Sequence, residues 1–179
     1  MKKILTVSVF TENAPGLLQR VTSVFTKRKL NIESITASVS EIDGIHRYTI
    51  VVMTDLEIAQ KVVNHLEKQV DVLKAFVHEA EDVVYQEIAL YKIKTELIVT
   101  EKEVELIVRN HNARILTFEK SFIVIEKTGH QDETQELYDS LQPYGILEFA
   151  RSGRVAITKP MKPLVEYLAE LENKYEYIK

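Results

Sequence analysis

Hydrophobic and polar positions alternate with a period near two at the start of the chain, over residues 3–10. This alternation is typical of a strand with one well-buried face. From residue 16 to residue 29 the period lengthens to 3.6 residues, with apolar positions on one side and polar positions on the other, which predicts an amphipathic helix. Pro15 suits the first turn of this helix, and Asn13 is a candidate for its N-cap.

Residues 30–77 predict a hairpin, a helix and a strand. Residues rich in Ile, Thr and Val predict strands at 30–40 and 45–53, joined by a turn at 41–44. Thr54 and Asp55 then cap a second helix, and strand character returns at 70–77. A βαββαβ unit with right-handed crossovers closes into a four-stranded antiparallel sheet with both helices on one face, which is the ferredoxin-like arrangement.

The second half repeats this order after an acidic link at 78–82. Its expected elements are a strand at 83–95, a helix at 101–110, a hairpin at 114–127, a helix at 131–141 and strands at 146–151 and 154–158. A last amphipathic helix begins near Leu164 and covers a sheet face or a partner. We therefore expect an α+β protein with ferredoxin-like domains at 1–78 and 83–158 and a terminal helix at 160–179.

The composition narrows the functional classes to which the chain can belong. The chain has 179 residues, of which 45% are hydrophobic, and its 23 Lys and Arg against 27 Asp and Glu give a net charge of −4. Binding to nucleic acid through bulk charge is therefore disfavoured. The absence of cysteine excludes disulfides, thiolate zinc sites and a cysteine nucleophile. Because the sequence has neither a signal core nor an apolar run of about 20 residues, we expect a cytoplasmic protein outside the membrane.

The sequence shows none of the common catalytic or metal-binding motifs. The five His residues lie in different elements without metal-ligand spacing, and we interpret His111 as part of a solvated turn. The sequence contains no Gly-x-Ser-x-Gly elbow and no Gly-rich phosphate loop. The alternate acids at 101, 103 and 105 point apart on a helix and do not form an acid–base pair. The basic cluster of Arg20 and residues 27–29 is explained by the first helix and its negative C-terminal end.

One junction does suggest ligand binding. At residues 12–16 a strand end meets a helix N-terminus, where free backbone N–H groups favour a carboxylate or another anion. Gly16 lets a ligand approach the backbone closely. Asn31, at the start of the next strand, carries both donors and an acceptor, which suits an α-amino acid. So small a ligand must be enclosed, and an interface between two copies of the chain would enclose it.

These residues carry a resemblance to a known family. The first half resembles the regulatory small subunit of acetolactate synthase, also called acetohydroxyacid synthase, and through it the ACT-domain amino-acid sensors. The more selective matches are Arg28 followed by Asn31-Ile32-Glu33-Ser34 and, near the end, Ala150-Arg151-Ser152-Gly153. The resemblance covers residues 1–158. Lys29 stands where that family usually has Gly before the Asn.

The resemblance implies a regulatory role without catalysis or cofactor in this chain. Thiamine diphosphate chemistry would belong to a separate large subunit, which this chain would activate on docking and inhibit when valine, leucine or isoleucine binds. The implied effector site contains Asn13, Ala14, Pro15, Gly16 and Leu17 from one chain. Asn31 and Ile32 from its partner in a homodimer would complete the site.

Two other classes remain as alternatives. The first is a stand-alone or transcription-linked ACT-domain sensor that never meets a synthase, although the sequence has no helix-turn-helix or basic reading helix. The second is a small enzyme on the ferredoxin-like fold, such as an acylphosphatase. Such an enzyme needs a catalytic Arg and a phosphate loop at the first turn, where this chain has Glu12.

Overall fold

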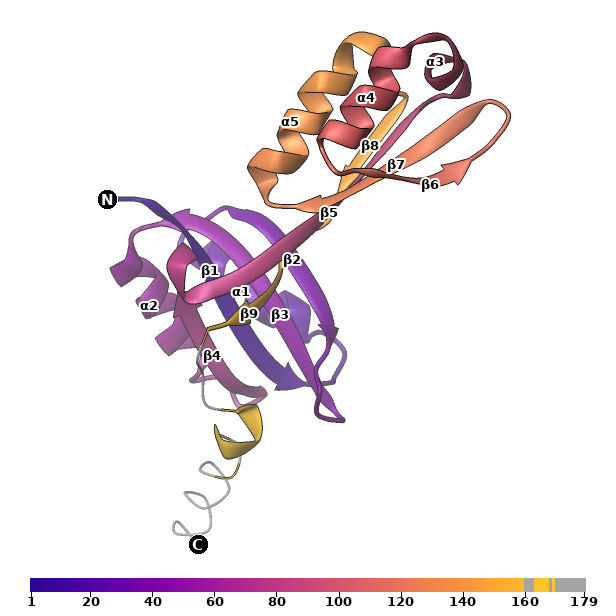
Figure 1. Ribbon diagram of the computed structural model, residues 1–179. Coiled ribbons are helices and arrows are strands. Elements are labelled where there is room, and N and C mark those ends of the chain that lie inside the picture. The colour runs from indigo at the N-terminus through magenta and orange to yellow at the C-terminus, as the bar shows by residue number, and fades with distance from the viewer. Residues whose placement is uncertain (160–162, 168, 170–179) are drawn as a thin grey trace, which may run out of the picture. The chain divides into compact units, whose positions relative to one another are not determined.

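The chain forms two compact units. The computed structural model describes residues 1–159, 163–167 and 169 (Figure 1). One unit comprises Met1–Val84 with the described residues from Ala156 onward, and the other comprises Tyr85–Val155. The second unit is therefore inserted into the first along the sequence. Sequence analysis assigned residues 156–158 to the second domain, whereas their contacts group them with the first unit.

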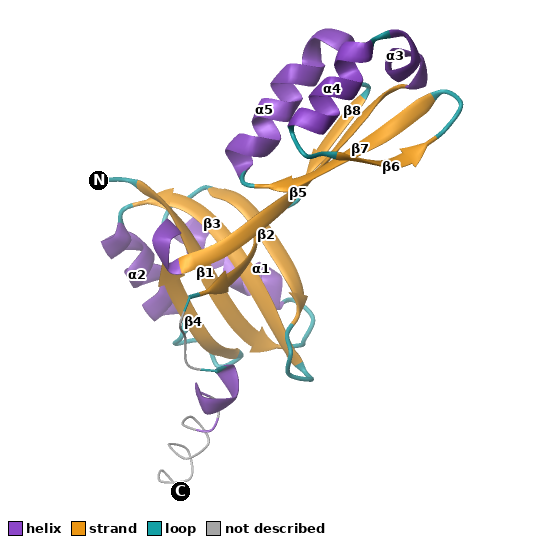
Figure 2. Ribbon diagram, in the orientation of Figure 1, coloured by secondary structure: helices purple, strands orange, loops and turns teal. Residues whose placement is uncertain are grey.

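The first unit is the predicted ferredoxin-like fold. Its elements are β1 (Lys3–Glu12), α1 (Leu17–Lys27), β2 (Ile32–Val39), β3 (Ile45–Thr54), α2 (Leu56–Leu66) and β4 (Val72–His78). The antiparallel sheet has the order β2-β3-β1-β4, and β1 pairs with β3 from Lys3 opposite Thr54 to Glu12 opposite Ile45. Figures 1 and 2 show α1 and α2 on one face of this sheet. This arrangement confirms the predicted α+β class.

The core of the first unit follows from the two periodicities of its sequence. Alternate β1 residues Leu5, Val7 and Val9 are fully buried because they face the helices. On α1, Val21 and Phe25 lie one turn apart on the face that packs against the sheet. Burial of one such side chain stabilises a fold by about 1.5–3 kcal/mol, so the amphipathic pattern fixes which helix face meets the sheet.

The start of α1 differs from its prediction. Asn13 does not cap the helix; the N-cap is Gly16, and no side chain caps this terminus. Gly16 has φ 85° and ψ −7°, a left-handed conformation that helical residues do not adopt, so α1 begins only at Leu17. Pro15 consequently lies in the turn before the helix rather than in its first turn. Asp55 is the N-cap of α2, as expected, but without a side-chain hydrogen bond.

The second unit repeats the topology of the first. Its elements are β5 (Val83–Lys94), α3 (Thr95–Thr100), α4 (Lys102–Asn110), β6 (Arg114–Phe118), β7 (Phe122–Gly129), α5 (Gln131–Leu141) and β8 (Glu148–Arg151). The sheet order β6-β7-β5-β8 corresponds strand for strand to that of the first unit, and β9 (Val155–Thr158) pairs with β5. Short 3₁₀ turns occupy Ala80–Asp82 and Gln142–Tyr144. The helix α3 was not predicted from the sequence.

The second face of the first sheet is covered by chain that follows the second unit. We call residues 156–159 and 163–167 the C-terminal segment. The Arg47 guanidinium donates to the Ala156 carbonyl at 2.5 Å, and Leu164 is buried with Phe10 and Ile45. Residues 164–167 are helical, as predicted for this part of the chain. The rest of the predicted terminal helix lies outside the described residues, apart from residue 169.

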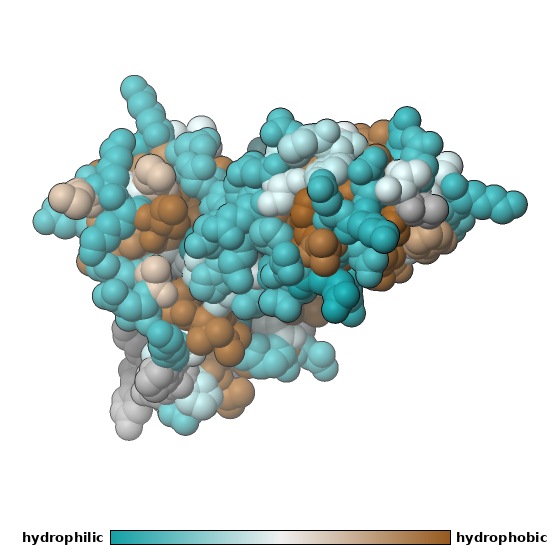
Figure 3. Space-filling model, turned by 45° about the horizontal axis from the view of Figure 1, so that its top comes forward, coloured by the Kyte–Doolittle hydropathy of each residue, from teal (hydrophilic) through white to brown (hydrophobic). Residues whose placement is uncertain are grey.

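The molecular surface is mainly polar on the side drawn in Figure 3, where apolar side chains form separate patches. Across the described ranges, no helix has the length and apolar character needed to cross a membrane.

Candidate functional site

The junction between β1 and α1 presents free backbone donors. The first hydrogen bond of α1 runs from the Arg20 N–H to the Gly16 carbonyl, so the N–H groups of the first turn have no acceptor within the helix. A Cβ built on Gly16 would meet nothing within 4 Å, which shows that this corner is open in the single chain. The first turn contains no acidic residue that would compete with an anionic ligand.

The turns that precede β3 and β4 hold this corner in place. The Glu12 N–H donates to the Asp71 carbonyl at 3.1 Å, and the Asn13 N–H donates to the Gly44 carbonyl at 2.8 Å. The Arg20 guanidinium forms an ion pair with the Asp71 carboxylate. The N–H groups of Glu12 and Asn13, at a junction where free donors were expected, are therefore engaged, and these contacts fix the chain just before the first turn of α1.

The structure brings together only part of the predicted effector site. Residues 13–16 are exposed and adjacent, whereas the Leu17 side chain is 3% exposed and offers a ligand only its backbone. Asn31 and Ile32 follow the other end of α1, and eleven helical residues span roughly 16 Å. Within one chain, Asn31 and Gly16 therefore lie beyond opposite ends of α1. A site that contains both residues would have to take them from two different chains.

Asn31 lies at an open sheet edge. It immediately precedes β2, which pairs only with β3 in the described sheet. The Asn31 side chain is exposed and donates to the Glu33 carboxylate at 3.1 Å. Ile32 is half-buried against the core, so its position is fixed while its neighbour remains accessible. An edge strand with free backbone groups is suited to meeting a second chain.

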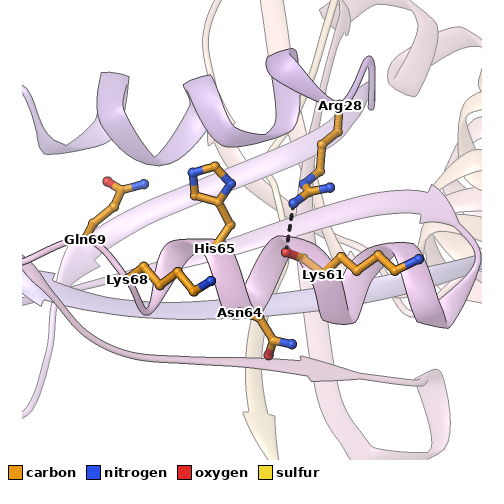
Figure 4. Close-up of a pocket in the computed structure, with 6 residues that line it drawn as sticks. All are labelled: Arg28, Lys61, Asn64, His65, Lys68 and Gln69. Atoms are coloured by element: carbon orange, nitrogen blue, oxygen red, sulfur yellow. Dashed lines mark hydrogen bonds between the residues drawn. The ribbon is translucent and has the colours of Figure 1, made fainter.

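A separate pocket was missed by sequence reasoning. It has a volume of about 410 Å³ and lies between the C-terminal end of α1 and one face of α2, and we call it the α1–α2 pocket (Figure 4). Its lining residues are Arg28, Lys61, Asn64, His65, Lys68 and Gln69. Four of them follow the spacing i, i+3, i+4, i+7 along α2 and the turn after it, a signal that the sequence does contain. Sequence analysis used Arg28 as a helix-terminal cation and as part of the family motif, but not as a pocket residue.

Three further groups of polar residues have structural partners. His130, Asp132 and Glu133 form a cluster with potential metal-ligand atoms, but all three are exposed and the Lys127 ammonium lies 3.9 Å from the Glu133 carboxylate. His111 Nε2 lies 3.3 Å from the Ser140 hydroxyl. In the Ala-Arg-Ser-Gly motif, Ser152 accepts a hydrogen bond from the Ile88 N–H at 2.9 Å, so the motif anchors the end of β8 to β5.

Comparisons with known proteins agree on one family for both units. Residues 7–74 match the model of the AHAS small subunit-like ACT domain, and residues 86–160 match that of the small subunit of acetolactate synthase. The acetolactate synthase small subunit of Bacillus subtilis is 36% identical over 160 residues, covering 89% of this chain and 91% of the relative. A probable acetolactate synthase small subunit of Archaeoglobus fulgidus is 35% identical over 159 residues, covering 88% and 98%.

A solved structure supports the same relationship. The crystal structure of the acetolactate synthase small subunit from Thermotoga maritima has a TM-score of 0.80 at 27% sequence identity. The similarity covers 89% of this chain and 99% of that one, so it includes both units rather than the first alone.

Proposed function

The chain belongs to the acetolactate synthase small-subunit family, and from this premise we propose that it is a cytoplasmic protein that regulates an acetolactate synthase whose catalytic large subunit is a separate chain. Its role in the complex is regulatory and non-catalytic. In this proposal the large subunit holds the thiamine diphosphate and carries out the reaction. The small subunit raises its activity on docking.

The proposed effector is valine, with leucine and isoleucine as related ligands. The observation that carries this proposal is the open helix N-terminus at Gly16, whose free N–H groups suit the effector carboxylate. A second copy of the chain would supply Asn31 and Ile32 and close the site over the small ligand. The separation of Asn31 from Gly16 along α1 supports a shared site, because one chain cannot provide both halves.

Regulation through this site is a coupling between two binding equilibria. Valine between two chains would favour one arrangement of the dimer, and docking of the large subunit would favour another. Each ligand then changes the affinity for the other by the same factor. A coupling of 1–3 kcal/mol corresponds to about 5- to 150-fold in affinity, which suffices for feedback inhibition.

Replacement of Gly16 by Asp tests the proposed site. The new carboxylate would lie where the effector carboxylate binds, so valine inhibition should be lost while activation by docking remains. The measurement is acetolactate formation by the purified large subunit with each small-subunit variant, with and without valine. Gly145→Asp is the matched control, since Gly145 also has a positive φ of 86° and open space at its Cβ position. Full valine inhibition of Gly16→Asp would show that the site is assigned wrongly.

Asn31→Ala tests the contribution of the second chain. We expect valine binding to weaken by about 1–3 kcal/mol, because the buried ammonium or carboxylate of the ligand would lose a partner. Isothermal titration with the small subunit alone measures this loss. A chain that binds valine but never alters synthase activity would favour the stand-alone sensor. A chain that stays monomeric with valine would exclude the shared site.

A further inference from the structure

We propose that the α1–α2 pocket binds the diphosphate or triphosphate group of a polyanionic ligand, at a place distinct from the amino-acid site. Its Arg28 side lies at the opposite end of α1 from Gly16. It is lined by three cations, an imidazole and two carboxamides, and no carboxylate contributes to its lining. This inference does not depend on the proposed regulatory function.

The three cations of this pocket are not paired with carboxylates of the described residues. Arg28, Lys61 and Lys68 take part in none of the ion pairs formed among the described residues. Glu67, next in sequence to Lys68, instead pairs with the Lys74 ammonium at 2.7 Å. Like charges gathered around a concave surface repel one another, and a bound anion removes this cost.

Helix dipoles reduce this charge but do not cancel it. Because α1 and α2 run antiparallel, the C-terminal end of α1 borders the pocket at Arg28 and that of α2 borders its opposite side, near Lys68 and Gln69 (Figure 4); each end carries roughly half a negative elementary charge. Two such ends offset about one of the three cations. A net charge of about +2 remains in a protein whose overall charge is −4, so the local field and not the bulk charge decides which ligand binds here.

Hydrogen bonds hold two of the polar side chains that line the pocket, Arg28 and Asn64. Arg28 Nη2 donates to the Lys61 carbonyl at 3.2 Å, which ties the guanidinium across from α1 to α2 (Figure 4). The Asn64 side-chain oxygen accepts from Gln60 Nε2 at 3.1 Å, so its NH₂ group is the part left for a ligand. Guanidinium, ammonium and amide donors together suit phosphate oxygens, and a planar guanidinium binds them through two parallel hydrogen bonds.

The ligand class follows from charge and size. A single carboxylate neutralises too little of the remaining charge, whereas a diphosphate or triphosphate group matches it. The volume of about 410 Å³ falls within the range of small-molecule sites. Since His65 is the only ring among the lining residues, the structure provides for the phosphates and not for stacking of a base on an aromatic side chain.

Calorimetric titration of the full chain with inorganic triphosphate and diphosphate tests this proposal. Binding should occur at constant ionic strength and should persist when sulfate replaces chloride. The double variant Lys61→Gln/Lys68→Gln should bind about 30-fold more weakly, because two charge-assisted hydrogen bonds are removed. The control Lys2→Gln/Lys27→Gln removes the same charge from exposed positions outside the pocket and should change the affinity less than twofold. Far-ultraviolet circular dichroism confirms that both variants fold.

Three results would overturn the proposal. The first is no binding of either phosphate compound. The second is equal weakening in the pocket and control variants, which would assign binding to bulk charge. The third is tighter binding of an acidic glutamate peptide than of triphosphate, which would make the surface a protein contact. ATP and triphosphate binding with equal affinity would support it and would place recognition in the phosphates.

Discussion

Tyr91 shows how a single buried residue makes stability depend on pH. Its side chain is fully buried in the core of the second unit, and its hydroxyl donates to the Thr134 carbonyl at 2.5 Å. Burial raises the pKa of Tyr91 to about 12, because the charged phenolate is poorly solvated there, while Arg151 opposes this shift. The unfolded chain releases the same proton near pH 10.

The sign of the effect follows from these two pKa values. Below pH 10 both states hold the proton and the second unit keeps its full stability. Between pH 10 and about 12 the unfolded state loses the proton first, so the free energy of unfolding falls as pH rises. In Tyr91→Phe we expect a loss of about 1 kcal/mol at neutral pH, and this loss should shrink above pH 10. Urea denaturation from pH 7 to 11.5 measures it; a difference that stays constant would contradict the assignment.

Lys29 and Gly16 show that the backbone angles of single residues could not be predicted from the sequence. Resemblance showed that Lys occupies a position where relatives usually have Gly, and the structure gives Lys29 a φ of 55°. The chain thus keeps the left-handed turn that Gly would favour and accepts a strain of roughly 1–2 kcal/mol. Gly16 was recognised from sequence as a close-approach position, but its left-handed angle, which excludes Asn13 as a cap, was not. Backbone angles depend on how the flanking elements pack, which local residue types do not specify.

At the scale of elements, strong periodicity predicted most helices and strands. Apolar and polar positions differ clearly enough to identify the helices α1, α2, α4 and α5 and the strand β1 from the sequence. The short helix α3 was missed because its sequence, Thr95–Thr100, is rich in residues that favour strands. The α1–α2 pocket was missed for a different reason: its cations come from two helices whose packing the sequence does not display.

Leu164 tests whether the C-terminal segment stabilises the first sheet. It is 3% exposed and packs with Phe10, Ile45 and, more loosely, Phe76. Leu164→Asp should lower the free energy of unfolding by about 2–5 kcal/mol and raise binding of an apolar dye, because it buries an unpaired charge or uncovers this face. Val165→Asp, at a neighbouring exposed position, is the control and should have little effect. Equal stability of the two variants would show that the segment contributes no packing energy.

At the scale of the whole molecule, two units with the same strand order are joined by insertion. Each has its own buried cluster, with Val7 and Phe25 in one and Tyr91 and Leu137 in the other. Separate cores of this kind support independent folding. Sequence analysis recognised the repeat, but placed the boundary after the last strand because sequence order alone does not show that the chain returns to the first unit.

Replacing residues 85–155 by a short Gly-Ser linker tests this independence. Since β9 pairs with β5, the two ends of the inserted unit lie close together and a short linker can join them. We expect the remaining chain to keep a dispersed two-dimensional NMR spectrum, with amide signals of β1 and β3 near those of the intact protein. The isolated fragment 85–155 serves as the complementary sample. Collapse of either spectrum to random-coil dispersion would show that the units fold only together.

The return of the chain also has a consequence for proteolysis. Two backbone connections lead to the inserted unit, one near residue 85 and one near residue 155. A cut near residue 155 leaves residues 1–84 covalently joined to the inserted unit, whereas a cut near residue 85 breaks the covalent path between them. After a cut near residue 85, the contacts of Leu164 with Phe10 and Ile45 still hold the C-terminal segment on the first sheet, so the cleaved chain stays associated through noncovalent interactions alone.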